Sequence, residues 1–344
     1  MLPTSLPTPE LFLPGRGEPS LRWGIVGTGW VGRFFPSALR AHTGQSVVAV
    51  TSLRPERAAA FAAEHGIAVV HESVEAMAAD PGIDVMYIAA PQADHLRLGL
   101  IAIAGGKHVL MEKPLATSAV DAQTLIDAAR AEGVFLMEAM WSRYQPQALT
   151  ITRLIADGVI GDVCSVVADH GQALAADPHH RLLQPGTGGG ALLDLGIYPI
   201  QLDSMVRGAP TGVTAIGALA PSGVDAYATV VLDHDAGEQS TLMASIVTKT
   251  PGVAAISGTE ATLQIEAPFH FPTAFTLRSP DFFEPALRWR DETGVELMDA
   301  LAWQATALAR YVGEGRAESP LHTHAETVSI LATIDEARRQ LGAR

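Results

Sequence analysis

The stretch Trp23-Gly24-Ile25-Val26-Gly27-Thr28-Gly29-Trp30-Val31-Gly32 decides the fold of this chain. A short apolar run, typical of a buried strand, leads into the spacing GxGxxG, and a helix is expected after it. In such a unit the first glycine permits a tight turn, the second lets a pyrophosphate approach the backbone, and the third lets helix and strand pack closely. The N-terminus of the helix also favours an anion. We therefore expect a dinucleotide to bind at this loop, through Gly27, Thr28, Gly29, Trp30, Val31 and Gly32.

Short apolar runs alternate with alanine-rich amphipathic stretches from Leu21 to about Met140. The runs predict strands at Arg22–Val26, Ser46–Thr51, Ala68–Val70, Val85–Ala89, His108–Met111 and Phe135–Glu138. The stretches between them predict helices, for example at Arg57–His65, His95–Gly105 and Ala119–Glu132. Because strands that alternate with helices pair in parallel, this part of the chain is expected to form a doubly wound parallel sheet of the α/β class.

Strand-like segments dominate the sequence after Arg143. Helices are predicted at Gln147–Asp157, Ala300–Glu314 and Thr323–Leu341. The predicted strands are Val163–His170, Val213–Leu219, Ala226–Leu232, Gln239–Val247, Ala254–Ser257, Ala261–Glu266 and Thr273–Arg278. Because little helix separates these strands, we expect an α+β domain with a large, mostly antiparallel sheet. The expected parts are an arm (1–20), a dinucleotide-binding domain (21–143) and a substrate and dimerisation domain (144–344), whose C-terminal helices are expected to pack back toward the first domain.

The bulk composition narrows the classes of partner. The chain has 344 residues, of which 37 are acidic and 23 basic, a formal net charge of −14 and no basic stripe. We therefore expect no nucleic-acid partner and no attraction to an anionic membrane surface. No apolar run reaches the roughly 20 residues that a membrane helix needs. The proline-rich N-terminus lacks the basic cluster of a signal peptide.

Cysteine and histidine usage bears on location and on metals. Cys164 is the only cysteine, so no internal disulfide can form, and a cytoplasmic location is expected. The 12 histidines, including the pair His179-His180, show no metal-ligand spacing with cysteine or carboxylates. The sequence therefore predicts no metal site.

The end of the second predicted strand bears on the choice of nucleotide. An acidic residue that binds the ribose hydroxyls of NAD is expected about 20 positions after the glycine loop. The sequence there is Val50-Thr51-Ser52-Leu53-Arg54, without an acidic residue, and Ser52, Arg54 and Arg57 are available instead. Because a guanidinium suits a 2′-phosphate, we expect NADP to be preferred, with NAD possible. The alternative is that Arg54 and Arg57 only begin a solvated helix.

Two further strand ends supply candidates for the nicotinamide end of the cofactor. Ala90, Pro91 and His95 follow one predicted strand, although His95 is also compatible with a simple helix start. Glu112-Lys113-Pro114 follows the next strand, at the edge where α/β sheets bind ligands. An ammonium group at Lys113 can hold a substrate oxygen or lower the pKa of a neighbouring phenol.

The segment Gly188-Gly189-Gly190-Ala191-Leu192-Leu193-Asp194-Leu195-Gly196-Ile197-Tyr198 joins a glycine run to an apolar stretch of helical period. Asp194 and Tyr198 are four residues apart, so they share one face of the predicted helix. A carboxylate and a phenol beside a flexible loop, which lets a ligand approach closely, suit acid–base chemistry. The alternative is a helix with one polar face under a loop.

Four motifs occur in the order Gly27–Gly32, Glu112-Lys113-Pro114, Glu138-Ala139-Met140-Trp141-Ser142-Arg143 and Gly189–Tyr198. With them the chain resembles, from Leu21 onward, the glucose–fructose oxidoreductase / inositol dehydrogenase (Gfo/Idh/MocA) family. Many members have histidine at the position of Tyr198. In the tyrosine and the Glu-Ala-x-Trp segment, the chain resembles the branch of the family that includes trans-dihydrodiol dehydrogenase and NADP-dependent xylose dehydrogenase. The chain departs from the family pattern at Gln92, because the family often has asparagine directly after the proline that corresponds to Pro91.

The resemblance implies a Rossmann domain, a second domain with an open antiparallel sheet, a tightly bound nicotinamide cofactor and, often, dimers formed through those sheets. We expect reversible hydride transfer between the nicotinamide and an alcohol carbon of a sugar, polyol or cyclic diol. The resemblance supports a pairing of Lys113 with Tyr198 in proton transfer, because an ammonium would lower the phenol pKa from its usual value of about 10. Asp194 is expected to bond the substrate or to orient the lysine, and Lys113 itself is the alternative proton carrier.

The remaining candidates are contacts of the substrate or of the cofactor. Trp141 and Arg181 join Lys113, Asp194 and Tyr198 as expected substrate contacts, because an aromatic ring and an arginine suit a polyhydroxylated ring. Glu112, Lys113, Trp141 and Arg143 are expected near the cofactor, although Trp141 also fits a core position. His270 is equally compatible with a loop-end histidine without a role.

Two other functions remain open at this point. One is a regulator on the same fold that senses a dinucleotide or a sugar without turnover. The other is an oxidoreductase that recycles a cofactor between two sugars without releasing it. The presence of Lys113, Asp194 and Tyr198 favours an enzyme, because a sensor has no need of a set of proton-transfer groups.

Overall fold

The computed structural model describes residues 2–175, 177, 179–235, 237–281 and 283–343, so Met1 of the predicted arm lies outside it. The described residues form two compact units. The parallel-sheet unit comprises Phe12–Tyr144 and Val295–Val328. The mixed-sheet unit comprises the described residues of Met1–Leu11, Gln145–Gly294 and Ser329–Arg344. Each unit is therefore assembled from segments that are distant in the sequence.

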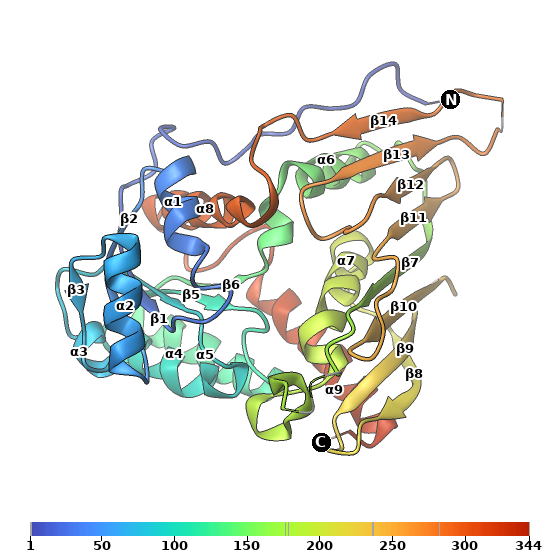
Figure 1. The fold of residues 1–344 in the computed structure, drawn as a ribbon. Coiled ribbons are helices and arrows are strands. Elements are labelled where there is room, and N and C mark those ends of the chain that lie inside the picture. Colours follow the sequence, from blue (N-terminus) through green and yellow to red (C-terminus); the bar gives the residue numbers. More distant parts are fainter. Residues whose placement is uncertain (1, 176, 178, 236, 282, 344) are drawn as a thin grey trace. The chain divides into compact units, whose positions relative to one another are not determined.

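A six-stranded parallel sheet forms the centre of the parallel-sheet unit, in the order β3-β2-β1-β4-β5-β6 (Figure 1). Its strands are β1 (Arg22–Val26), β2 (Ser46–Thr51), β3 (Val69–Val70), β4 (Val85–Ile88), β5 (His108–Glu112) and β6 (Leu136–Ala139). The helices between them are α1 (Phe35–His42), α2 (Pro55–His65), α3 (Val74–Ala78), α4 (His95–Ala104) and α5 (Ala119–Glu132). A later helix, α8 (Leu301–Gly313), packs against α1. The strand order reverses between β1 and β4, as in Rossmann sheets, so the predicted doubly wound sheet is confirmed.

Buried strands and an aromatic cluster stabilise this sheet. All four residues of β4 are buried, as expected for a strand that is covered on both faces. Phe35 of α1 stacks on Tyr87 of β4 with the ring centroids 4.0 Å apart, and Trp23 of β1 lies 5.4 Å from Phe35. The loops that follow β1 and β4 therefore begin at strands anchored in a packed core.

An eight-stranded sheet forms the centre of the mixed-sheet unit, in the order β14-β13-β12-β11-β7-β10-β9-β8. Its strands are β7 (Val163–Gly171), β8 (Gly212–Leu219), β9 (Asp225–Asp233), β10 (Gln239–Ser245), β11 (Ala254–Gly258), β12 (Thr262–Ile265), β13 (Ala274–Arg278) and β14 (Leu287–Arg290). Among the described strands of this sheet, β10 and β7 pair in parallel and the other pairs are antiparallel, which confirms the prediction.

Helices cover one face of the mixed sheet. The helix α7 (Ile197–Arg207) packs on β7 and β10 and against α6 (Pro146–Ala156). The C-terminal helix α9 (His324–Leu341) ends beside β8, where the Gln340 side-chain amide donates to the carbonyl oxygen of Val213 over 2.7 Å. Figure 1 shows α7 alongside β7 and β10. The segment that carries Asp194 and Tyr198 is therefore held against the centre of this sheet.

The opposite face of the mixed sheet carries exposed apolar side chains. Ser240 of β10 donates a hydrogen bond to Asp203 of α7, so the alternate residues of β10 point away from the helices. The strand register places Val167, Ile216 and Tyr227 on this same outer face. They are 53%, 68% and 45% exposed, respectively. The face of this sheet is thus open in this chain.

Some local features differ from the sequence prediction. Neither α3, which has only five residues, nor the edge strand β14 was expected. The helix after the glycine loop begins only at Phe35, because Pro36 in its first turn fixes the start there and Val31–Phe34 form turns. A π-helical turn at Leu192–Gly196 precedes α7, in place of a regular helix through Asp194. Such turns are frequent at functional sites.

Candidate active site

The phosphate loop is shaped by contacts with the residue after β4. Gly27 has φ +104°, and a Cβ atom there would lie 2.5 Å from the carbonyl oxygen of Ala89, so only glycine fits. A Cβ atom at Gly32 would lie 3.0 Å from the Gly27 carbonyl oxygen, so the third glycine permits close packing. At Gly29 the nearest atom to a Cβ would be 3.8 Å away, so the chain leaves this position open. The loop therefore fits a pyrophosphate that approaches at Gly29.

The end of β2 lies beside this loop and carries the predicted ribose-phosphate contacts. The Thr28 hydroxyl donates to the Ser52 hydroxyl oxygen over 3.4 Å. Arg54 directly precedes α2, and Arg57 lies in its first turn. Both arginine side chains are exposed, and neither forms an ion pair within the part of the chain that the structure describes. These groups are accessible to an anion, and their contact with a nucleotide stays a prediction.

The backbone on both sides of Lys113 is held by side chains from neighbouring strands. The Tyr87 hydroxyl donates to Glu112 Oε1, and Glu112 is the last residue of β5. The backbone N–H of Leu115 donates to Glu138 Oε1 over 2.9 Å. The predicted position of Lys113 at the carboxyl end of a strand is thus observed.

His95 connects the segments that follow β4 and β5. Its Nδ1 lies 2.8 Å from the carbonyl oxygen of Pro114, and its Nε2 lies 3.1 Å from that of Ala90. Burial lowers the pKa of His95, which favours the neutral ring. Pro91 follows Ala90 and precedes the 3-10 turn Gln92–Asp94. The His95 side chain is therefore engaged within the unit, and its contact with a cofactor stays a prediction.

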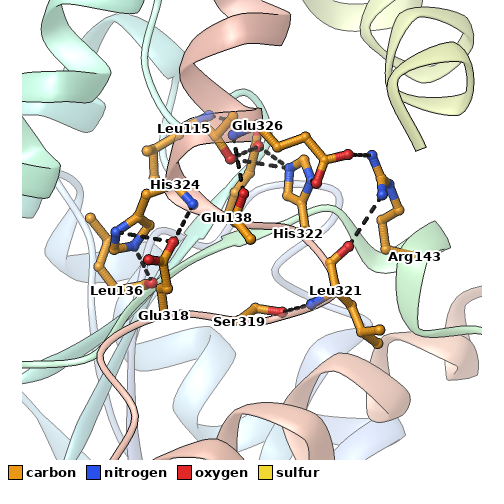
Figure 2. Close-up of polar contacts among 12 residues, drawn as sticks. Leu115, Leu136, Glu138, Arg143, Glu318, Ser319, Leu321, His322, His324 and Glu326 are labelled. Carbon is orange, nitrogen blue, oxygen red and sulfur yellow. Dashed lines mark hydrogen bonds and ion pairs between the residues drawn. The ribbon is translucent and has the colours of Figure 1, made fainter. Parts of the chain in front are cut away.

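The 3-10 turn Trp141–Tyr144 follows β6 and buries two predicted site residues. Trp141 and Arg143 are each 4% exposed. The Arg143 guanidinium pairs with Glu326, and its Nη1 donates to the carbonyl oxygen of Leu321 over 3.2 Å (Figure 2). Burial lowers the pKa of Arg143, and the charge of Glu326 opposes that shift. Arg143 thus joins two segments of this unit, and its contact with a cofactor stays a prediction.

In the mixed-sheet unit, Arg181 and Asp194 form an ion pair, with Arg181 Nη2 3.0 Å from Asp194 Oδ1. Arg181 begins a short 3-10 turn, and Asp194 lies in the π-helical turn. The Arg181 side chain is 49% exposed, whereas that of Asp194 is 12% exposed. The structure thus brings two predicted substrate contacts together, and the guanidinium retains an exposed surface for a polar ligand.

Two histidine rings pack against Tyr198 in the same unit. The ring centroids of Tyr198 and His270 are 4.3 Å apart, and those of Tyr198 and His170 are 5.5 Å apart. The His170 Nδ1 lies 3.3 Å from the carbonyl oxygen of Leu195. Sequence reasoning missed His170 and left the role of His270 open. Both residues are distant from Tyr198 along the chain, so no local pattern could have connected them.

Two glycines of the run before Asp194 lie close to other parts of the chain. A Cβ atom at Gly189 would lie 2.6 Å from the carbonyl oxygen of Leu182. Gly190 has φ +120°, and its Cβ atom would lie 2.3 Å from Asp225 Oδ1. Atoms of the chain itself therefore occupy the space that side chains at these two glycines would take, and the approach of a ligand to this run stays a prediction.

Asp225, the first residue of β9, is a structural partner of this segment that sequence reasoning missed. Its Oδ2 accepts a hydrogen bond of 2.6 Å from the backbone N–H of Leu192, at the start of the π-helical turn. The residue is fully buried, and burial raises its pKa to about 6. Asp225 thus anchors the turn that carries Asp194, and it requires glycine at Gly190.

Two other features bear on the kind of site. Among the residues that the structure describes, no group of three or more histidine, cysteine, aspartate or glutamate side chains could hold a metal ion. Over the same residues, no helix is both long enough and apolar enough to cross a membrane.

A glycine phosphate loop on a doubly wound sheet, with a carboxylate and a phenol on a second unit, defines the class of two-unit nicotinamide-dependent oxidoreductases. Comparison with known proteins agrees with this class. The Gfo/Idh/MocA description "Oxidoreductase family, NAD-binding Rossmann fold" matches residues 21–140, and the Gfo/Idh/MocA C-terminal domain matches residues 148–264. The chain belongs to the Gfo/Idh/MocA oxidoreductase family.

Individual relatives cover nearly the whole chain. A trans-1,2-dihydrobenzene-1,2-diol dehydrogenase from Danio rerio is 37% identical over 334 residues, which are 94% of this chain and 97% of the relative. A levoglucosan dehydrogenase, solved with NADH and levoglucosan, has a TM-score of 0.85 at 20% identity and covers 94% of this chain and 97% of its own. A 3-ketoreductase from Actinomadura kijaniata, solved with NADP, has a TM-score of 0.80 at 25% identity, with coverage of 94% and 98%. The predicted family, fold and dehydrogenase class are confirmed.

Proposed function

We propose that this protein transfers a hydride reversibly between the nicotinamide of NADP and an alcohol carbon of a sugar, polyol or cyclic diol. The observation that carries the proposal is the phosphate loop, which the chain fills at Gly27 and Gly32 and leaves open at Gly29. The substrate class is supported by the name of the Danio rerio relative, which is a diol dehydrogenase.

The residues proposed for proton transfer are Tyr198 and Lys113. A bound nicotinamide supplies or accepts the hydride. In the oxidative direction, a base must take the hydroxyl proton while the alcohol carbon loses its hydride. The Tyr198 phenolate is this base, and the Lys113 ammonium favours the phenolate by its charge. Asp194, which Arg181 holds at 3.0 Å, accepts a hydrogen bond from a substrate hydroxyl.

The proposed cofactor contacts follow the loops at the carboxyl ends of the parallel strands. Backbone N–H groups of Gly27–Gly32 hold the pyrophosphate, and Ser52 and Arg54 hold the 2′-phosphate, with Arg57 nearby on α2. The exposure of both arginines supports NADP over NAD.

We also propose a homodimer that forms through the open face of the mixed sheet. Val167, Ile216 and Tyr227 expose apolar surface on this face, and clustered apolar surface marks an association site. Light scattering should give the mass of a dimer for the native chain and of a monomer for Ile216→Lys. A monomeric native chain would contradict this part of the proposal. The single cysteine supports a cytoplasmic location, which fractionation of the native host would test.

The test of the reaction is the absorbance of reduced nicotinamide. The purified protein is incubated with NADP or NAD and with a panel of aldoses, polyols and cyclic trans-diols. Steady formation of reduced cofactor with one class supports the proposal and names that class. Binding of the cofactor without reduction across the panel supports the sensor instead. Conversion of two sugars without added cofactor supports the sugar–sugar oxidoreductase.

A further inference from the structure

The parallel-sheet unit contains a buried polar network centred on Glu138 of β6 (Figure 2). The Glu138 side chain is 1% exposed and accepts three hydrogen bonds. The donors are the Leu115 backbone N–H at 2.9 Å, His322 Nε2 at 2.7 Å and the Thr327 hydroxyl at 3.1 Å. A buried carboxylate is costly without such donors, so this one is tied closely to the geometry of its partners.

Two of these donors come from a C-terminal segment, residues 317–327, that runs beside β6. The Leu136 N–H donates to the carbonyl oxygen of Ala317 over 3.2 Å, and His324 Nε2 lies 2.9 Å from the carbonyl oxygen of Leu136. Glu326, in the first turn of α9, pairs with Arg143. Figure 2 shows the contact of His324 with Leu136 and that of Glu326 with Arg143 on either side of His322. The segment is therefore fastened to β6 and to the turn after it, and it presents His322 and Thr327 to Glu138 in a fixed position.

The third donor lies two residues after Lys113. Leu115 is 1% exposed, so its buried N–H relies on the carboxylate as its acceptor. Tyr87 holds Glu112, and His95 contacts the Pro114 carbonyl oxygen at 2.8 Å. The main chain is thus held before and after Lys113, which fixes the direction in which this side chain leaves the backbone.

We infer that Glu138 is a positioning residue for Lys113, held as a hydrogen-bond acceptor by His322 and Thr327. The inference rests on the proposed function, because it requires Lys113 to take part in turnover. Glu138 itself touches neither substrate nor cofactor in this scheme. It acts by fixing the backbone that carries the ammonium group.

The test compares Glu138→Leu with Glu138→Gln. Leucine removes the acceptor of the Leu115 N–H, whereas glutamine keeps an oxygen for it and turns its amide N–H toward His322. We expect leucine to lower kcat about 10- to 100-fold, the effect typical of a lost supporting contact, with KM and cofactor Kd within about threefold of the native values. Glutamine should restore most of kcat. Hydrogen exchange at the Leu115 amide should be slow with glutamine and fast with leucine.

The matched control is Asp203 in the mixed-sheet unit. It is a buried carboxylate that accepts hydrogen bonds from a histidine, His234 at 3.2 Å, and from a hydroxyl, that of Ser240. Asp203→Leu should therefore lower the melting temperature as Glu138→Leu does, yet leave the kcat of the folded protein near its native value. A comparable loss of kcat in both variants would assign the effect to general loosening and overturn the inference.

A double-mutant cycle with Lys113→Ala separates the inference from the proposed function. If Glu138 acts through Lys113, adding Glu138→Leu to Lys113→Ala should change kcat less than about twofold. Additive losses would overturn the inference. Native turnover in Lys113→Ala would instead remove the ammonium from the proposed mechanism, and the inference with it, while absence of turnover in the native chain across the substrate panel would overturn the proposed function. Should Glu138→Leu fail to fold, Thr327→Val removes one donor only, and its smaller loss of kcat must likewise vanish in the Lys113→Ala background.

Discussion

The two units hold their candidate residues by different means. In the parallel-sheet unit the main chain is fixed: Gly27 admits no side chain, and the backbone beside Lys113 is hydrogen-bonded before and after it. In the mixed-sheet unit side chains hold one another: Arg181 pairs with Asp194, and histidine rings pack on Tyr198. The first arrangement suits tight binding of a phosphate by backbone groups, and the second suits proton transfer by oriented side chains. Substitutions in the phosphate loop of the parallel-sheet unit should therefore change mainly the Kd for the cofactor, and substitutions at Tyr198 in the mixed-sheet unit should change mainly kcat.

The largest expected effect follows from Tyr198→Phe. The variant keeps the ring packed against His170 and His270 and removes only the hydroxyl. We expect kcat to fall about 10³-fold, within the range for general acid–base groups, while the Kd for NADP changes less than about threefold. Tyr227→Phe, on the open sheet face, is the matched control and should leave both unchanged. Undiminished kcat in Tyr198→Phe would remove the phenol from the mechanism.

A comparison of two glycines tests whether each loop is filled by ligand or by protein. A methyl group at Gly190 meets Asp225 Oδ1 at 2.3 Å and requires φ +120°, so Gly190→Ala should lower the free energy of unfolding by about 3 kcal/mol. Gly29→Ala meets no atom closer than 3.8 Å, so its unfolding free energy should change by less than about 0.5 kcal/mol. Its Kd for NADP should rise about 10-fold, because the methyl group enters the path of the pyrophosphate. Urea unfolding and fluorescence titration measure the two quantities.

The opposite pattern would contradict the comparison. If Gly29→Ala is strongly destabilised while Gly190→Ala is as stable as the native chain, then Gly29 is the glycine packed against other atoms of the chain and Gly190 is the open one. Equal Kd values for the native chain and Gly29→Ala would show that the cofactor does not approach this glycine.

Asp225 predicts a pH dependence of stability that belongs to the mixed-sheet unit. Burial raises its pKa to about 6, against about 3.9 in an unfolded chain. The folded state therefore binds the extra proton between about pH 4 and pH 6, and the contribution of Asp225 to stability decreases as the pH rises through this window. The full decrease is about 3 kcal/mol, from two pKa units.

Asp225→Asn should remove this decrease, because the amide carries no charge while its oxygen still accepts the Leu192 N–H. Urea unfolding of both proteins at steps from pH 4 to pH 7 gives the difference directly. Asp233→Asn, at the other end of β9, controls for the loss of a half-buried carboxylate in the same strand. Identical slopes in the native chain and Asp225→Asn would show that this carboxyl group does not titrate near pH 6.

The sequence predicted the local features of both units better than the contacts between distant residues. The bounds of β1 and β2 coincide with the predicted ones, because continuous apolar runs and flanking turns mark buried strands. The glycine run shows the limit: Gly29 and Gly190 look alike in sequence, but only the structure shows that Asp225 fills the space beside Gly190. The spacing of residues along the chain predicts local backbone conformation. It does not predict which distant side chain packs against a given residue.

The same limit applies to Glu138, which the sequence placed in a motif without assigning it a task. Its partners Leu115 and His322 are 23 and 184 residues away along the chain. A buried carboxylate acquires its role from such partners, and no period of two or 3.6 residues connects them. Networks of this kind become visible only when the fold is known.

The smallest expected effect concerns the choice of nucleotide in the parallel-sheet unit. Arg54→Ala should raise the Kd for NADP about 10-fold, the equivalent of one charge-assisted hydrogen bond, and leave the Kd for NAD unchanged. Arg57→Ala, at the same helix start, is the matched control and should raise the Kd for NADP only about threefold, because its contact is purely electrostatic and screened. A rise in both Kd values for Arg54→Ala would place its guanidinium near a phosphate that the two cofactors share. Arg54 would then bind the pyrophosphate together with the backbone at Gly29. The preference for NADP would have to come from other residues.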